Sequence, residues 1–314
     1  MHDGSRKAIF AAFLANLGIA IAKFVGFLLT GATSMLAEAV HSVADTTNQG
    51  LLFLGGSKAK RSPTKDHPFG YGRERYFWAF VVAVIIFTAG SMFALYEGEE
   101  KLRHPHELES PAIAVTILLV AICLEAYSLR TAVRESRPAK GDLTWWQFIR
   151  RAKVPELPVV LLEDVGALFG LALALVGVVL AATTGNGRYD ALGSIAIGLL
   201  LGVIAVVLSI EMKSLLIGES ATPTTVARIR QAMESDPRVR RVIHLRTEHL
   251  GPEDLLVGAK LEFDHDLGFP EVAEAIDRVE ERVRAAVPEA RVMYIEPDVY
   301  HPERTDQDPA STPI

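Results

Sequence analysis

Two stretches of this chain are long, apolar and free of formal charge, and they restrict the possible folds more than any other feature. Phe77–Tyr96 and Ala191–Ile210 each reach the roughly 20 apolar residues that a helix needs to cross a bilayer. Four further apolar runs contain one to three ionisable residues each. With 50% of all residues hydrophobic, the sequence predicts an α-helical membrane protein with six transmembrane helices. The four interrupted spans are Ala8–Thr30, Ser34–Gly56, Pro111–Leu129 and Leu157–Thr183.

Lysine and arginine are distributed unevenly among the short connections, which predicts the orientation of the helices. Basic residues concentrate at 58–75 and 130–153, whereas the opposite connections have few. We therefore expect both basic loops and both termini in the cytoplasm of a multi-pass protein of the cell membrane. The first apolar run is too long for the core of a secretory signal, so we expect it to be the first span. Thr144–Ile149, followed by Arg150, predicts a short helix at the lipid headgroups.

The long apolar runs give way after residue 211 to short, charged and well-punctuated segments. A helix is predicted near 223–233 and another from Pro270, with strands at 242–247, 255–263 and 291–296. The segment 249–254 is expected to be the turn between the first two strands. We thus expect a transmembrane domain over 1–211, a small α+β cytosolic domain of order α-β-β-α-β over 212–299, and a disordered tail over 300–314.

Composition and motifs exclude several classes of function. A single cysteine, Cys123, leaves no intramolecular disulfide framework and no cysteine-cage zinc site. The net charge of −6 arises in the C-terminal part, which argues against nucleic-acid binding. No HExxH motif occurs, so an intramembrane metallohydrolase would lack its metal pair and general base. We expect a protein that is not an enzyme and has no resident cofactor.

Ionisable residues inside the second predicted span are the strongest functional signal, because each costs about 2.5–3.5 kcal/mol at the centre of a membrane helix. Glu38, His41, Asp45 and Asn48 are spaced by three, four and three residues, which places them on one face of a helix. Asp164, in the fifth predicted span, is expected at a similar depth to Asp45. The two carboxylates can therefore face each other.

An imidazole and two carboxylates suit a borderline divalent metal such as Zn²⁺. We predict His41, Asp45 and Asp164 as metal ligands, with Glu163 and Asn48 as secondary candidates. Glu163 is about 100° around the helix from Asp164, so we do not expect both to point the same way. The alternative for these residues is a hydrogen-bonded polar seam between helices, without a metal.

Two further ionisable residues in the spans have simpler explanations. Lys23, in the first predicted span, is expected at the depth of Glu38, and a buried ion pair would account for both. Glu125, in the fourth predicted span, fits either a polar contact between helices or an access path. The sequence leaves that choice open.

Two motifs resemble those of the cation diffusion facilitators. The segment Ser34–Asp45, with the sequence SMLAEAVHSVAD, is similar to that family's second-span signature, which ends in HxxxD. His67–Arg73, followed by Glu74, is similar to the family's cytosolic loop. The resemblance covers nearly the whole chain, and it implies six spans, exchange of divalent cations for protons, and a homodimer joined partly through the C-terminal domains.

The resemblance also assigns positions in the site. It implies that His41, Asp45 and Asp164 are ligands, but the fifth-span pattern departs at Val160, where His or Asp is expected. One protein ligand is therefore missing. Glu163, Asn48 or a water molecule are the candidates to complete the shell.

Together these features predict efflux of a divalent cation, with Zn²⁺ the first choice, in exchange for H⁺. His41 favours zinc over Mn²⁺, which an all-oxygen site would suit better. The alternatives are a Mn²⁺, Fe²⁺ or Co²⁺ carrier of the same architecture and a non-transporting membrane metal sensor or scaffold. The expected partners are the metal ion, protons, the lipid bilayer and a second copy of the chain, and nucleic acid is not expected.

Overall fold

The computed structural model describes residues 3–105 and 110–302, with side chains at 17–84, 88–105 and 110–302. The described chain forms two compact units. The first contains the chain up to Lys60 together with Glu74–Lys213, and the second contains Arg61–Arg73 together with the chain from Ser214 onward. Most of the tail predicted to be disordered, from residue 303 onward, lies outside the described residues.

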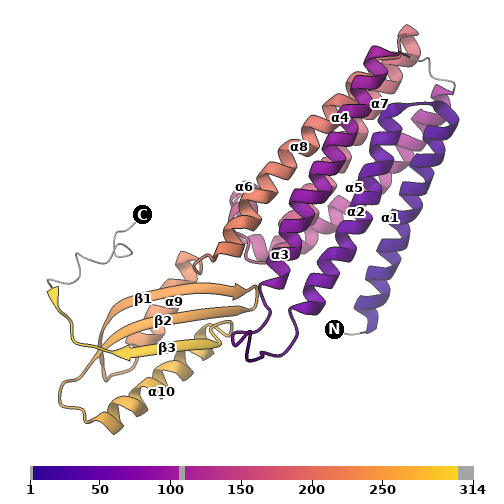
Figure 1. Cartoon of the computed structure of the whole chain (residues 1–314). Helices are drawn as coiled ribbons and strands as arrows, with labels where there is room; N and C mark the ends of the chain where they lie inside the picture. The colour runs from indigo at the N-terminus through magenta and orange to yellow at the C-terminus, as the bar shows by residue number, and fades with distance from the viewer. Residues whose placement is uncertain (1–2, 106–109, 303–314) are drawn as a thin grey trace. The chain divides into compact units, whose positions relative to one another are not determined.

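The first unit is built of long helices that run side by side (Figure 1). Every predicted span lies within one of them, and the third contains one turn of π-helix, η1. The short helix predicted at the lipid headgroups is also present, as α6, with Thr144 and Gln147 forming a capping box at its start. The helices are α1 (Asp3–Thr30), α2 (Thr33–Lys58), the continuous run α3 (Glu74–Val81), η1 (Val82–Ile86) and α4 (Phe87–Arg103), then α5 (Pro111–Lys140), α6 (Trp145–Arg151), α7 (Glu156–Thr184) and α8 (Arg188–Ile217).

Four helical stretches in the described chain are long and apolar enough to cross a membrane, and they identify a multi-pass membrane protein. The first two predicted spans are helical but do not meet that criterion within the described residues. α2 carries the polar residues Glu38, His41, Asp45 and Asn48 on one face (the polar stripe), and these residues lower its mean hydropathy. For α1 and α2, the transmembrane assignment therefore stays a prediction. The qualifying stretches are Glu74–Arg103, Pro111–Lys140, Glu156–Thr184 and Arg188–Ile217.

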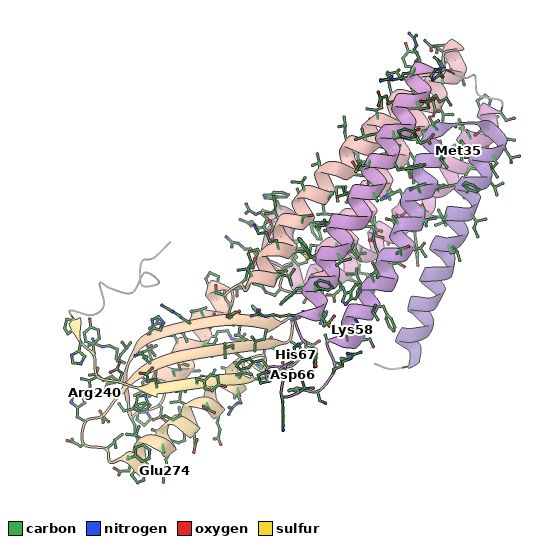
Figure 2. The ribbon with its side chains drawn as sticks, in the orientation of Figure 1. Met35, Lys58, Asp66, His67, Arg240 and Glu274 are labelled. Atoms are coloured by element: carbon green, nitrogen blue, oxygen red, sulfur yellow. The ribbon has the colours of Figure 1, made fainter. Side chains whose placement is uncertain are left out.

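α2 occupies a central position in the first unit, because it packs against α1, α3, α4 and α7. Its Glu38 side chain lies against Gly170 of α7, where a Cβ atom would overlap the carboxylate as it is now placed. At its C-terminal end, the Lys58 ammonium lies 4.8 Å from the centre of the Trp78 ring (Figure 2). The helix with the polar stripe is therefore surrounded by protein over much of its length.

Asp190, in the first turn of α8, caps the N-terminus of α2 from a different helix. The residue before α2, Ala32, has no side chain that could do this. The Asp190 carboxylate accepts hydrogen bonds from the Thr33 backbone N–H at 2.8 Å and from the Ser34 hydroxyl, and it pairs with the Lys101 ammonium of α4 at 2.8 Å. This buried network joins α2, α4 and α8, and sequence analysis did not predict it.

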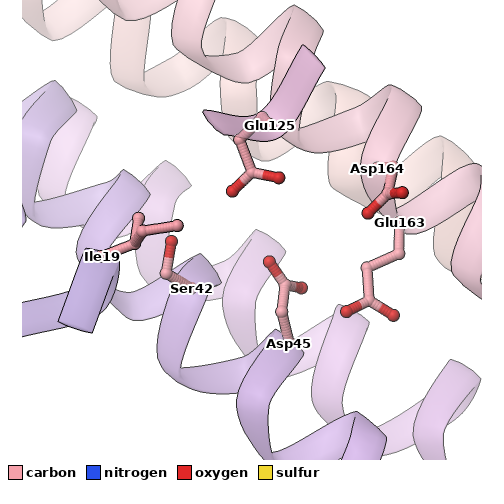
Figure 3. A pocket seen from close by; sticks show the side chains of 6 residues that line it. All are labelled: Ile19, Ser42, Asp45, Glu125, Glu163 and Asp164. Atoms are coloured by element: carbon pink, nitrogen blue, oxygen red, sulfur yellow. The ribbon is translucent and has the colours of Figure 1, made fainter. Parts of the chain in front are cut away.

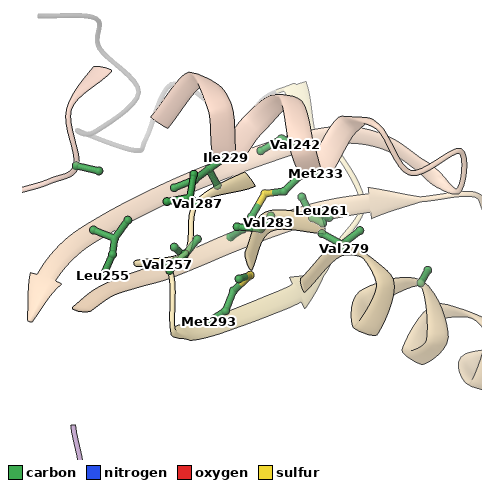
Figure 4. Packing of buried hydrophobic residues seen from close by; sticks show 14 of the residues in the cluster. Ile229, Met233, Val242, Leu255, Val257, Leu261, Val279, Val283, Val287 and Met293 are labelled. Atoms are coloured by element: carbon green, nitrogen blue, oxygen red, sulfur yellow. The ribbon is translucent and has the colours of Figure 1, made fainter. Parts of the chain in front are cut away.

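The second unit is a three-stranded sheet of order β1-β2-β3 with two helices on one face (Figure 4). β1 (Val239–Gly251) and β2 (Asp254–Phe263) are antiparallel, and β2 and β3 (Val292–Pro297) are parallel. Alternate residues of β2, from Leu255 to Phe263, are buried against α9 (Pro223–Glu234) and α10 (Phe269–Ala286). The predicted α-β-β-α-β order is confirmed, although β1 extends to Gly251 and the turn is shorter than expected.

The motif loop His67–Arg73 packs within the second unit. His67 and Thr64 exchange backbone hydrogen bonds of 3.1 and 3.2 Å, which form a tight turn at the position that Figure 2 labels. Gly72 lies against the backbone of Leu250 and Gly251, so that a Cβ on Gly72 would overlap the Leu250 carbonyl oxygen and a Cβ on Gly251 would overlap Gly72. Arg73 forms an ion pair with Glu248 of β1. The loop therefore belongs structurally to the C-terminal sheet.

Asp236 connects the end of α9 to α10 in the second unit. Its side chain is 1% exposed, accepts a hydrogen bond from the Arg238 backbone N–H at 3.0 Å, and pairs with Arg278 and Arg282 at 3.1 and 3.6 Å. Burial alone would raise the pKa of Asp236, but the Arg238 N–H and the two guanidinium groups outweigh it and hold the pKa below its ordinary value.

We expect Asp236→Asn to lower the thermal stability of the full-length protein at neutral pH. A depressed pKa in the folded state stabilises the fold above the ordinary pKa of 3.8, and this contribution is lost as pH falls through the folded pKa. The difference in unfolding temperature between wild type and variant should therefore persist down to pH ~4 and shrink below it. Asp277→Asn, at an exposed position of α10, is the matched control. A pH-independent difference would contradict this account.

Candidate metal site in the helical unit

Four polar side chains of α2 lie in the interior of the first unit. Glu38, His41, Asp45 and Asn48 follow one face of the helix, and none of them is more than 6% exposed. Such burial of ionisable groups requires partners or a ligand, because an uncompensated buried charge is costly. The stripe predicted from the sequence is therefore confirmed as a buried feature.

A small cavity opens between α1, α2, α5 and α7 beside this stripe (Figure 3). Its volume of about 10 Å³ is enough for one water-sized sphere. Asp45 and Asp164 both line it, so the prediction that these two carboxylates can face each other across the helices is confirmed. The full lining consists of Ile19, Ser42, Asp45, Glu125, Glu163 and Asp164.

Glu163 and Asp164 both line the cavity, although their positions lie about 100° apart around α7. That they do not point the same way without a bend in the helix stays a prediction. Figure 3 shows how the two residues, neighbours on α7, both direct carboxyl groups toward Asp45. The cavity lies between several helices, and the longer glutamate side chain reaches it from one flank while the aspartate reaches it from the other.

Several buried oxygen and nitrogen atoms around the cavity make no hydrogen bond within the described part of the chain. They include Asp45 Oδ1, Glu163 Oε2 and both polar atoms of the Asn48 amide. Buried polar atoms are paired in most proteins, so these atoms are candidates to contact an ion bound at the cavity. Asn48 itself is not among the residues that line the cavity.

His41 lies beside Asp45, with its Nδ1 atom 3.5 Å from Asp45 Oδ1. It does not line the cavity, and the described residues contain no group of three or more His, Cys, Asp or Glu residues already arranged to hold a metal ion. The structure thus brings Asp45, Asp164 and Glu163 together and leaves His41 next to the first of them. The assignment of these residues as ligands stays a prediction.

Lys23 and Glu38 form the predicted buried ion pair, at 3.2 Å with neither side chain exposed. The ammonium also donates a hydrogen bond of 2.7 Å to the Ser42 hydroxyl. Glu125 Oε1 is farther away, at 4.0 Å. The lysine therefore places one positive charge directly beside the carboxylate-lined cavity.

Asp164 is held by a hydrogen bond from α5, and Val160, four residues before it, has a packing role. The Ser128 hydroxyl of α5 donates to Asp164 at 3.1–3.2 Å, a contact that no sequence spacing indicates. Val160 packs against an apolar cluster that includes Ala132 and Ile149. The position that carries a ligand in the family motif is therefore used here for packing.

Comparison with known proteins agrees with this architecture. Residues 9–217 match the family described as the cation efflux transmembrane domain, and residues 221–298 match the cation efflux protein cytoplasmic domain. The chain belongs to the cation efflux family. This confirms the resemblance to cation diffusion facilitators that the motifs indicated. The helical unit corresponds to the transmembrane domain of that family, and the small sheet domain corresponds to its cytoplasmic domain.

Individual relatives match most of this cation efflux protein. The mitochondrial proton-coupled zinc antiporter SLC30A9 of Mus musculus is 36% identical over 264 residues, which cover 83% of this chain and 46% of that protein. Metal tolerance protein C4 of Arabidopsis thaliana is 30% identical over 262 residues, 83% of this chain and 57% of that protein. The chain spans about half the length of these relatives. A structure of the MamM CTD in a nickel form is 22% identical over 26% of this chain and 100% of that chain, with a TM-score of 0.24.

We expect Lys23→Met to destabilise the protein by about 3–5 kcal/mol, because it leaves Glu38 as an uncompensated buried charge. The double variant Lys23→Met/Glu38→Gln removes both charges and should recover part of this loss. Thermal unfolding in detergent micelles measures both effects. If the single variant unfolds at the temperature of the wild type, the ion pair does not support the helical unit.

Proposed function

We propose that this protein exports a divalent metal ion from the cytoplasm in exchange for protons, and that Zn²⁺ is its preferred substrate. The observation that carries the proposal is the buried cavity between α2, α5 and α7, in which carboxylates outnumber the available positive charge. Membership of the cation efflux family supports it, as does similarity to a protein described as a proton-coupled zinc antiporter.

The coupling follows from competition for the same side chains. A metal ion binds ionised carboxylates and neutral imidazole, so binding releases protons and protonation releases metal. If the helices expose the cavity to each side in turn, metal bound at cytoplasmic pH is displaced by protons on the other side. Each proton that moves inward supplies about 2.3 kcal/mol per 100 mV of membrane potential.

The choice of zinc rests on His41, whose ring lies beside Asp45 and would supply a nitrogen ligand. A carrier for Mn²⁺, Fe²⁺ or Co²⁺ with the same architecture is the runner-up, because the cavity lining itself contains only oxygen donors. A non-transporting sensor or scaffold is the alternative from another class. The proposal includes no enzymatic reaction and no cofactor besides the transported ion.

The proposal also covers assembly and location. The domain match at 221–298 and the family resemblance support a homodimer joined partly through the C-terminal domains. The basic residues at 58–75 and 130–153 support cytoplasmic loops and termini in a cell membrane. The mouse relative is described as mitochondrial, and that description is a property of the relative.

We expect purified protein in liposomes to accumulate ⁶⁵Zn when a pH gradient is imposed, and Asp45→Asn to reduce uptake to the level of protein-free liposomes. The substitution keeps the shape of the side chain but removes a charge from the cavity. Asp142→Asn, at an exposed position, is the matched control. Absence of uptake by the wild type under every gradient would favour the scaffold.

We further expect the affinity for Zn²⁺ to fall as pH is lowered, since protons compete for the same groups. Isothermal titration of the full chain between pH 8 and about pH 6 measures this dependence. Protons should be released on binding, which buffers of different ionisation enthalpy detect. Binding without proton release would separate metal recognition from proton exchange and would contradict the proposed coupling.

A further inference from the structure

Glu125 of α5, which sequence analysis left as either a polar contact between helices or an access-path residue, points into the cavity. It lines the cavity together with Asp45 of α2 and Asp164 of α7. Figure 3 shows its carboxyl group directed into the space that these two aspartates face. The residue is 9% exposed, so it is withdrawn from solvent and from the lipid.

The ion pair of Glu125 with Lys23 is long and is shared with another carboxylate. The nearest cation in the described chain is the Lys23 ammonium, 4.0 Å away, and that group is closer to Glu38 at 3.2 Å and to Ser42 at 2.7 Å. One ammonium thus faces two carboxylates and is engaged mainly by Glu38. The Glu125 carboxylate remains available to a second cation on the cavity side.

The lining of the cavity is rich in negative charge. Asp45, Glu125, Glu163 and Asp164 bring four carboxylates to a space of about 10 Å³. Glu163 Oε2 is buried without a hydrogen-bond partner in the described residues, and Asp45 Oδ1 is buried with only the His41 ring nitrogen 3.5 Å away. A bound divalent ion would satisfy these atoms and offset the excess negative charge.

We propose that Glu125 contacts the transported cation and supplies, from α5, the ligand that α7 lacks at Val160. Val160 is packed in an apolar cluster and cannot contribute, and Asn48 lies outside the cavity lining. The site is then formed by three helices, α2, α5 and α7. This inference rests on the proposed transport of a divalent metal.

A carboxylate from α5, in addition to those of α2 and α7, affects which metal ion the site prefers. Carboxylate oxygens suit Mn²⁺, whereas imidazole nitrogen suits Zn²⁺. The polar side chains that line the cavity carry only oxygen atoms, and Glu125 adds one more carboxylate to them. Glu125 therefore determines specificity by strengthening the binding of oxygen-preferring ions, and its removal shifts the preference toward zinc.

The test is isothermal titration of the purified full-length protein in nanodiscs with Zn²⁺ and with Mn²⁺. Glu125→Gln keeps the size of the side chain and removes its charge, and we expect the affinity for Mn²⁺ to fall roughly tenfold or more, with a smaller loss for Zn²⁺. Glu135→Gln, an exposed glutamate of the same helix, should change neither affinity by more than about twofold. Thermal unfolding of each variant checks that it is folded.

The outcomes separate this inference from the proposed function. Wild-type binding together with unchanged affinities in Glu125→Gln overturns the role of Glu125 and leaves metal transport standing. Equal losses for both ions overturn its role in specificity. If the wild type binds neither ion, the proposed function fails first. Should Glu125→Gln not fold, Glu125→Asp keeps the charge but shortens its reach, and wild-type affinities for both ions in that variant also overturn the inference.

Discussion

The cost of placing charge in the interior of a membrane domain governs the helical unit of this protein. Four carboxylates from α2, α5 and α7 line one cavity, and the buried Lys23 pairs with Glu38 at 3.2 Å and with Glu125 at 4.0 Å. The arrangement is stable only if another positive charge is present for part of the time. In the proposed function, a transported cation and the protons that replace it would meet this requirement in alternation, so the same imbalance would account for both binding and release.

The surrounding fold keeps this imbalance in place. α2 is enclosed by its neighbours, packs its Glu38 side chain against Gly170 of α7, and has its N-terminus capped by Asp190 from α8. The Lys101 ammonium balances Asp190, so the end of α2 carries no net excess of charge. At the N-terminus of α2, the charge of Asp190 is thus paired with that of Lys101. Near the middle of α2, where the cavity lies, the carboxylates outnumber the described positive charges.

The sequence predicted the elements better than the contacts between them. The apolar runs were sufficient to predict the long helices, and the alternation of apolar and polar residues was sufficient to predict β2. The ion pair of Lys23 and Glu38 could be predicted because both residues were expected at the same depth in neighbouring helices. The contributions of Glu125 and Ser128 could not be predicted, because they depend on which face α5 turns toward α7. Whether Glu163 reaches the cavity could not be decided from the sequence, since the position of a cavity between helices is not contained in the periodicity of one helix. The cap that Asp190 provides joins residues more than 150 positions apart and leaves no local signal.

The loop between α2 and α3 has a practical implication for how the protein can be divided. Because Gly72 and Arg73 are held by Gly251 and Glu248, truncating the chain after α8 would not simply detach an accessory module. The shortened chain would retain a connection whose docking surface had been deleted, directly after the helix that carries His41 and Asp45. Loss of activity in such a truncation would therefore not by itself prove a regulatory role for the C-terminal domain.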